Sequence, residues 1–424
     1  MSARRTPVEI TTLPSGLRVA TERMPGARSV SAGVWVGAGA RDEPDELAGV
    51  SHFLEHLLFK GTEDRSARQI AESIDRVGGD MNAFTTKEYT AYYSRLPAAQ
   101  LGLGLEVLGD VLTAPALRDT DVESERQVIL EELLMDEDSP EDKAHTLLYE
   151  SLFPRHPLGR ETAGVRDTVT AVTPDDVRRF FDQWYRPSTM VVAVAGGLDH
   201  DLVVAEVERR FPGPAGGSRP LRQPPSDTVV PLVVRRRRTE QAHLALGFRG
   251  VSRDDPDREA LDVLNHCLGG GMSSRLFDEI REQRGLAYAV YSAPSAYADA
   301  GALAIYAGTT PANVDPVLDL IEVELKKLVA AGLSDDELAV AKGYLTGSYL
   351  LSLEDPSSRM ARLGGLLVTT GEVRPVAEQV ARWEAVDQDA VRAVIDRVLS
   401  GPRALAAVGP LTKASLAPHR FALV

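Results

Sequence analysis

The chain has 424 residues, which exceeds one ordinary core and predicts at least two domains. Its composition, 43% hydrophobic and 26% charged, is typical of globular proteins and excludes disordered, collagen-like and coiled-coil classes. The formal net charge of −15 argues against nucleic acid as a partner, because that binding depends on cationic side chains that neutralise phosphate. The single cysteine, Cys267, excludes an internal disulfide and a cysteine-rich zinc site.

The beginning of the chain shows no targeting segment. Residues 1–6 lack the apolar core of a secretory signal, and no run approaches the ~18 apolar residues of a membrane span. We therefore expect no membrane partner and a cytoplasmic location, in a bacterium. The alternative is the mitochondrial matrix, because Arg4 and Arg5 also fit a very short presequence.

In chain order, the first half alternates strand-like and helix-like segments. Apolar periodicity and strand-like runs predict a strand at 34–36, helices at 46–59 and 120–137, and a strand at 190–194. The second helix is expected to begin with the capping box Thr120-x-x-Glu123, and Val128, Ile129, Leu133 and Leu134 are expected to form its buried side.

The second half repeats the first. The segment RDEPD at 41–45 recurs as RDDPD at 253–257, an offset of 253 − 41 = 212, and a further match follows at offset 214. Strands at 244–248 and 404–408 and a helix at 334–353 complete the second half. We predict an α+β protein of two homologous repeats, residues 1–211 and 231–424, joined by a Pro/Gly-rich linker at 212–230.

The strongest chemical signal is the sequence His52-Phe53-Leu54-Glu55-His56. His52 and His56, at i and i+4 of a predicted helix, lie on one face and can share a zinc ion, with the Glu55 carboxylate beside them. This is the inverted zinc-peptidase motif of the inverzincins. The alternative is a pair of structural histidines on a half-buried helix.

Two histidines need a third ligand, and the helix at 120–137 carries five glutamates. Glu125 and Glu132 are seven residues apart and therefore share one helix face. An inward carboxylate there requires a metal or a cation. The alternative is a solvated acidic face, and the spacing alone does not choose among the five.

The stretch His52–Thr62, HFLEHLLFKGT, resembles the zinc helix of the pitrilysin family, in particular bacterial processing-peptidase-like proteases and the beta subunit of mitochondrial processing peptidase. The resemblance implies that Glu132, which ends ERQVILEE, is the third zinc ligand and that Glu125 supports a ligating histidine. The segment at 78–85 is similar to the family's edge strand, which implies that Asn82, Ala83 and Phe84 bind substrate. In the second repeat, the resemblance implies that Arg281 and Tyr288 hold substrate near the scissile bond.

Offset 212 places Leu264, Cys267 and Leu268 where the first repeat has His52, Glu55 and His56, so the second repeat is expected to hold no metal. The nearby glycines at 269–271 lack the spacing of a phosphate loop and predict a tight turn or a mobile loop at a cavity.

The resemblance implies a zinc metalloendopeptidase with one zinc per chain that cuts unfolded peptides in an enclosed cavity. Glu55 is expected to act as the general base toward water at the zinc. The acidity of the chain favours basic peptides. The two repeats are expected to form one bowl-shaped half of a peptidase clamshell, completed by a second copy in a homodimer or by a paralogue. The alternatives are a non-catalytic scaffold and a subunit that binds peptides without cutting them.

Overall fold

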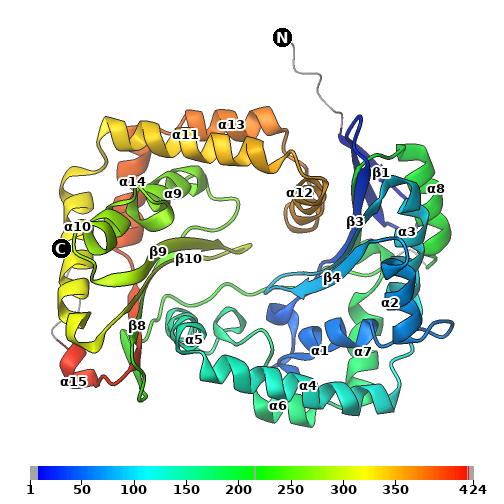
Figure 1. Ribbon diagram of the computed structural model, residues 1–424, viewed down its shortest axis with the longest axis horizontal. Helices are drawn as coiled ribbons and strands as arrows, with labels where there is room; N and C mark the ends of the chain where they lie inside the picture. The colour runs from blue at the N-terminus through cyan, green and yellow to red at the C-terminus, as the bar shows by residue number, and fades with distance from the viewer. Residues whose placement is uncertain (1–7, 214–215, 418, 420–424) are drawn as a thin grey trace. The chain divides into compact units, whose positions relative to one another are not determined.

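The computed structural model describes residues 8–213, 216–417 and 419 (Figure 1). These residues form two compact units. Unit 1 contains the described parts of 1–133, 161–222 and 350–373, and unit 2 contains those of 134–160, 223–349 and 374–424.

Each unit is built on one mixed sheet in which most neighbouring strands are antiparallel. The sheet of unit 1 has the order β1-β2-β6-β3-β5-β4, and the sheet of unit 2 has the order β7-β11-β8-β10-β9. The strands of unit 1 are β1 (Val8–Thr12), β2 (Arg18–Arg23), β3 (Ser29–Val36), β4 (Asp80–Thr85), β5 (Thr90–Pro97) and β6 (Met190–Gly196). Those of unit 2 are β7 (Leu232–Arg236), β8 (Ala242–Gly250), β9 (Ala287–Ala296), β10 (Gly301–Thr309) and β11 (Arg403–Gly409).

The two sheets share one topology over five strands. The parallel pair β2 and β6 corresponds to the parallel pair β7 and β11, and the edge hairpin of β4 and β5 corresponds to that of β9 and β10. Strand β1 has no counterpart among the described strands of unit 2. The predicted α+β class with two homologous repeats is confirmed.

Helices pack against both sheets. In unit 1 they are α1 (Val50–Leu58), α2 (Ala67–Asp75), α3 (Leu101–Thr113), most of α4 (Asp119–Asp138), α6 (Arg166–Ala171), α7 (Pro174–Trp184), α8 (His200–Arg210) and α12 (Pro356–Thr369). In unit 2 they are α5 (Pro140–Leu152), α9 (Arg258–Asn265), η6 (His266–Gly270), η7 (Phe277–Glu282), α10 (Val314–Ala331), most of α11 (Asp335–Ser352), α13 (Val376–Glu384), α14 (Gln388–Leu399) and α15 (Lys413–Leu416).

The two halves of the chain exchange one sheet-covering helix each. Helix α12, late in the sequence, packs on the sheet of unit 1, where Gly364 is so close to Trp35 that a Cβ would lie 2.1 Å from its ring. Helix α5, early in the sequence, packs on the sheet of unit 2, where Leu148 and Leu152 lie over Gly247. The compact units are therefore discontinuous in sequence, whereas the predicted repeats, 1–211 and 231–424, are contiguous.

Three local expectations were wrong. The run predicted as one helix at 46–59 is a short 3-10 turn at Asp45–Leu47 followed by α1, because Gly49 between them has φ +97°. Helix α4 begins at Asp119, so Thr120 lies inside the helix rather than at its N-cap. Val128 and Leu134 are 47% and 45% exposed, whereas Ile129 is buried as expected.

The predicted linker contains no helix or strand over its described residues, 212–213 and 216–230. The boundary between the units falls at Arg222, within this segment. In the described part of the chain, no helix is both long and apolar enough to cross a bilayer.

Candidate metal centre

Helix α1 presents two histidines on the side opposite its apolar stripe. Phe53, Leu54 and Leu57 of this helix are buried in the core of unit 1. Because His52 and His56 are one turn apart on the other side, their side chains meet, and their Nε2 atoms are 3.3 Å apart.

Helix α4 adds a carboxylate to this pair. Oε2 of Glu132 lies 3.7 Å from Nε2 of His52 and 3.6 Å from Nε2 of His56. Three ligands on a tetrahedral zinc at ~2.0–2.1 Å are separated by roughly 3.3 Å, so the three atoms lie close to the spacing that zinc requires. Among the described residues, this is the one group of three metal-ligating side chains whose ligand atoms lie within 4.8 Å of one another.

A buried carboxylate orients one of the histidines. Glu125, two turns before Glu132 on α4, is 3% exposed and lies 2.9 Å from Nδ1 of His56. Lys60, which follows α1, forms an ion pair with the other oxygen of Glu125. Because a carboxylate accepts, the Nδ1–H of His56 donates to Glu125, which leaves the lone pair of Nε2 available to a metal.

The group contains a buried oxygen that lacks a hydrogen-bond partner among the described residues, which fits a site for a metal. Oε2 of Glu132 is shielded from solvent and accepts no hydrogen bond from any described residue. Burial, together with the neighbouring His56, lowers the pKa of His52 to about 4, so its imidazole is neutral at pH 7, as a ligand must be. Nδ1 of His52 is also buried and has no hydrogen-bond partner among the described residues, so only His56 has a carboxylate support.

The general-base candidate lies on the same helix. Glu55 accepts a hydrogen bond from the hydroxyl of Thr85, the last residue of strand β4. Burial raises the pKa of the Glu55 carboxyl, while the Thr85 hydrogen bond and His56 act in the opposite direction. A carboxylate in this environment holds a proton more readily than one in water.

Comparison with known proteins identifies the relatives of this arrangement. Residues 18–166 match the family described as "Insulinase (Peptidase family M16)" and residues 171–345 match "Peptidase M16 inactive domain". An uncharacterized zinc protease of Streptomyces coelicolor is 46% identical over 95% of this chain and 90% of its own length. The chain belongs to the M16 peptidase family.

Further relatives of this M16 chain extend the comparison. An uncharacterized zinc protease of Bacillus subtilis is 38% identical over 94% of this chain and 97% of its own length. A probable beta subunit of the mitochondrial processing peptidase of Arabidopsis thaliana is 33% identical over 95% of this chain and 78% of its own length. The crystal structure of a protease from Helicobacter pylori shares the fold, with a TM-score of 0.89 at 22% identity over 96% of this chain and 100% of that chain. The predicted family resemblance is confirmed.

The predicted substrate strand of the M16 chain is an edge strand. Strand β4 pairs only with β5 among the described strands, which leaves its other edge open. Asn82 and Phe84 point to the exposed side of β4, and Ala83 between them is half-buried. Oδ1 of Asn82 accepts a hydrogen bond from the backbone N–H of Ala83.

Arg281 and Tyr288 lie in unit 2, and the structure brings these two side chains together. The guanidinium carbon of Arg281 lies 4.8 Å from the ring centroid of Tyr288 and 4.7 Å from that of Phe277. The Tyr288 side chain is 79% exposed. The pair therefore presents a stacked cation and phenol to solvent at the beginning of β9.

The second repeat replaces the metal residues with core residues. Leu264, Cys267 and Leu268 are all buried. Burial raises the pKa of the Cys267 thiol to about 12, so it is not a reactive thiolate. The glycines that follow are in a π-helical turn and a bend rather than a phosphate loop.

Sequence reasoning missed Lys60 and Thr85 as parts of the site. Lys60 lies inside the HFLEHLLFKGT segment, but its partner is Glu125 on α4, so no local spacing indicates the pair. Thr85 contacts Glu55 only through the fold of the β4–β5 hairpin, so no spacing in the sequence indicates it.

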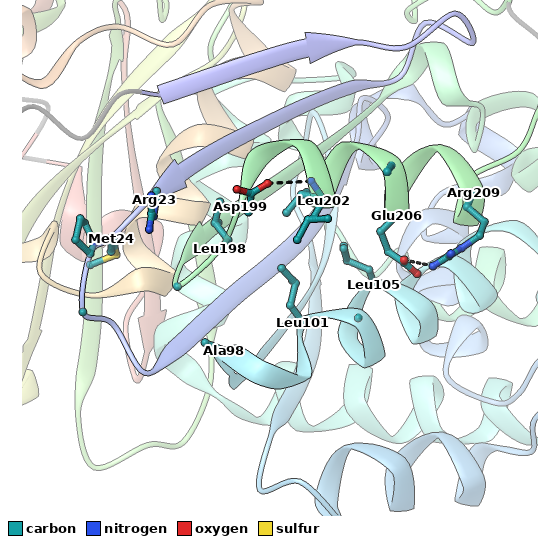
Figure 2. Close-up of a pocket in the computed structure, with 16 residues that line it drawn as sticks. Arg23, Met24, Ala98, Leu101, Leu105, Leu198, Asp199, Leu202, Glu206 and Arg209 are labelled. Carbon is teal, nitrogen blue, oxygen red and sulfur yellow. Dashed lines mark hydrogen bonds and ion pairs between the residues drawn. The ribbon is translucent and has the colours of Figure 1, made fainter.

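A separate apolar groove of about 690 Å³ lies between α3, α8 and the turn after β2, and contains none of the metal-centre residues (Figure 2). Leu101, Leu105, Leu198 and Leu202 line it, and a salt bridge between Glu206 and Arg209 lies at its rim.

Proposed function

We propose that the chain is a zinc-dependent endopeptidase that holds one zinc through His52, His56 and Glu132. The observation that carries the proposal is the convergence of these three ligand atoms beside Glu55. The zinc proteases among the relatives support the metal, and membership of the M16 family supports peptide hydrolysis.

Bound zinc would supply Lewis acidity that polarises the carbonyl of the scissile peptide bond. The chain's own residues prepare this position. His52 is neutral because burial lowers its pKa, and His56 presents Nε2 because Glu125 accepts its other ring proton. Glu132 contributes one negative charge, which partly balances the dication.

Glu55 moves the proton in the proposed reaction. Thr85 fixes one oxygen of Glu55, so the other oxygen is free to accept a proton from the attacking water. Burial raises the pKa of this carboxyl, so the same group can retain the proton and then donate it to the leaving amine.

The open edge of β4 supports an extended, unfolded peptide as substrate. A peptide that adds as a further strand would pair its backbone with Asn82, Ala83 and Phe84. Arg281 and Tyr288 of unit 2 would hold the peptide near the scissile bond, and the net charge of −15 would favour basic peptides. We further propose a homodimer in the cytoplasm as the working form.

A non-catalytic scaffold is the competing function, because residues 171–345 match an inactive domain. That match includes the end of the first repeat and the part of the second repeat in which Leu264, Cys267 and Leu268 stand at the metal positions. Every proposed metal and base residue lies within 18–166, in the part that matches the peptidase description. The inactive-domain match contains none of these residues, so the scaffold and the peptidase are separated by experiment.

The test combines metal analysis with a peptide-cleavage assay on the purified chain. We expect about one zinc per chain and cleavage of unstructured peptides. His52→Ala should lose both, whereas His200→Ala, which removes a histidine bonded to Thr11 and Thr21 in the same unit, should keep both. A chain that binds no zinc and cleaves no peptide in a diverse library would instead support the scaffold, and one that binds peptides without cutting them would support the binding subunit.

A further inference from the structure

One residue of the linker between the repeats is anchored in unit 1. Most of the linker is exposed, but the side chain of Arg222 is only 18% exposed. Its Nε and Nη2 atoms each lie 2.8 Å from an oxygen of Asp42, a bidentate ion pair. Nη2 also donates to the backbone carbonyl of Glu88 at 2.6 Å, and Nη1 lies 3.5 Å from the Glu88 carboxylate.

The two partners of Arg222 belong to segments that support the metal centre. Glu88 lies in the turn between β4 and β5. Asp42 lies in the loop before α1, and the backbone of this loop hydrogen-bonds that turn, from Ala40 to Thr86 at 3.0 Å and from Arg41 to Lys87 at 2.7 Å. Arg222 therefore clamps the loop and the turn together from outside.

The same loop holds the beginning of the metal helix. Glu43, next to Asp42, accepts hydrogen bonds from the backbone N–H groups of Gly49 at 2.8 Å and Ser51 at 2.7 Å. These amides open helix α1, which carries both histidines and Glu55. The turn between β4 and β5 begins directly after Thr85, whose hydroxyl donates a hydrogen bond to Glu55.

The side chains of the clamp are buried, so each of its charges is stabilised by the opposite charges beside it rather than by water. The side chains of Asp42 and Glu88 are 1% and 2% exposed, and Arg41 also pairs with Glu88 at 2.8 Å. Removal of Arg222 would take a positive charge away from two buried carboxylates, and a buried carboxylate that loses its partner is costly. The loop and the turn would then move apart.

From these contacts we propose that Arg222 is a positioning residue of the metal centre, which holds the β4–β5 turn and the α1 loop so that Thr85 meets Glu55. The expected effect of Arg222 on turnover rests on the proposed peptidase function. The segment that joins the repeats thereby becomes part of the active structure of the first repeat, rather than a spacer.

The repeat offers a matched control. In the second copy of the motif, Asp255 forms a bidentate ion pair with Arg397 of helix α14, at 2.7 and 3.0 Å, and Asp257 accepts from the same guanidinium at 3.0 Å. Arg397→Ala therefore removes a similar arginine–aspartate clamp from the repeat that lacks the metal residues. The control matches the arginine–aspartate contact but not its burial, because the Arg397 side chain is 52% exposed and that of Arg222 is 18% exposed.

The experiment compares Arg222→Ala, Arg397→Ala and the parent chain in three measurements. For Arg222→Ala we expect unchanged zinc stoichiometry, a kcat/KM for an unstructured peptide that falls about ten- to a hundredfold, and faster hydrogen exchange at residues 84–89. Arg397→Ala should lower thermal stability without changing kcat/KM or exchange at these residues. Arg222→Lys, which keeps the charge but loses the bidentate contact, should be intermediate.

A double-mutant cycle with Thr85→Val tests the route of the effect. If Arg222 acts through Thr85, the double variant should lose less kcat/KM than the product of the two single losses. Equal exchange at 84–89 in Arg222→Ala and the parent, or an equal loss of kcat/KM in Arg397→Ala, would overturn the inference. If the parent chain cleaves no peptide, the proposed function fails, while the exchange measurement still decides the role of Arg222.

Discussion

Oε1 of Glu125 lies 2.9 Å from Nδ1 of His56, so a buried carboxylate on α4 fixes the tautomer of a histidine on α1. The second oxygen of Glu125 pairs with Lys60, which balances its charge inside unit 1. This contact orients the His56 ring and joins two helices that are distant in sequence, α1 and α4, at the candidate metal centre.

The first prediction concerns this support. Glu125→Gln keeps an acceptor near His56 but removes the charge, so zinc affinity should fall about ten- to a hundredfold. The measurement is a competition titration with a zinc chelator. Glu131→Gln removes the same charge from an exposed position on α4 and should bind zinc as the parent does. An unchanged affinity in Glu125→Gln would show that the carboxylate does not support the ligand.

The second prediction separates metal binding from turnover. Glu55→Gln is nearly isosteric and still accepts a hydrogen bond from Thr85, but it cannot take up a proton. Zinc stoichiometry should stay at that of the parent, and kcat should fall by at least ~100-fold. Metal analysis and single-turnover cleavage are measured on the same preparation. Parental kcat in this variant would remove Glu55 from the mechanism.

The sequence predicts the centre of the metal site well because helical spacing is local. His52 and His56 are fixed by an i, i+4 spacing, and their side chains meet as expected. The two-turn spacing correctly places Glu125 and Glu132 on one face of α4, yet it does not distinguish ligand from support. In the structure the two differ in place: Glu125 is 3% exposed and lies against His56 alone of the two histidines, whereas Oε2 of Glu132 lies beside both.

Features that depend on tertiary contacts were not predictable. The apolar faces of α5 and α12 indicate that each packs on a sheet, but nothing local indicates that each packs on the sheet of the other half. The capping box at Thr120 failed because the helix already begins at Asp119, where the N–H groups of Asp121 and Val122 bond the carbonyl of Arg118. Arg222 lies in a Pro/Gly-rich stretch whose composition indicates only a linker.

The third prediction concerns the substrate. Unfolded cationic peptides should be cut faster than neutral peptides of the same length, because the chain carries a net charge of −15. Raising salt from ~20 mM to ~500 mM should lower kcat/KM for the cationic peptide several-fold and change the neutral one much less. A stably folded protein without exposed loops should resist cleavage. Efficient digestion of such a protein would argue against an enclosed site.

The fourth prediction concerns pH and the stability of unit 2. Nε2 of His145 lies 2.8 Å from the Tyr291 hydroxyl, and this hydroxyl donates its hydrogen bond to Glu141. Burial lowers the pKa of His145, although Glu141 and Asp142 act in the opposite direction. The unfolded chain therefore takes up this proton first as pH falls below about 6.5, so His145 makes the folded state less stable on acidification.

We expect the urea concentration at the midpoint of unfolding to decrease as pH is lowered from about 6.5 to about 5. In His145→Gln the unfolding free energy should depend less steeply on pH, by the equivalent of up to one proton. Tyr291→Phe removes the hydrogen bond but keeps the histidine, so it should lower stability at every pH and retain the slope. Equal slopes in the parent and His145→Gln would show that His145 does not carry the dependence.

The last prediction is that two copies of the chain complete the site in trans. Glu55 and the metal residues lie in unit 1, whereas Arg281 and Tyr288 lie in unit 2, where Tyr288 is 79% exposed. A twofold homodimer would let the exposed pair of each copy reach the metal of its partner. The test mixes two inactive variants, Glu55→Gln and Tyr288→Phe.

In a mixed dimer of these variants, one site combines Glu55 from the Tyr288→Phe chain with Tyr288 from the Glu55→Gln chain, so that site is intact. Free exchange at equal concentrations makes about half of the dimers mixed, with one intact site of two in each. Roughly a quarter of the activity per site of the parent should therefore return. Subunit exchange is measured separately with differently labelled chains. Demonstrated exchange without recovered activity would place the whole site within one chain, because a site shared between two chains would be restored once in every mixed dimer.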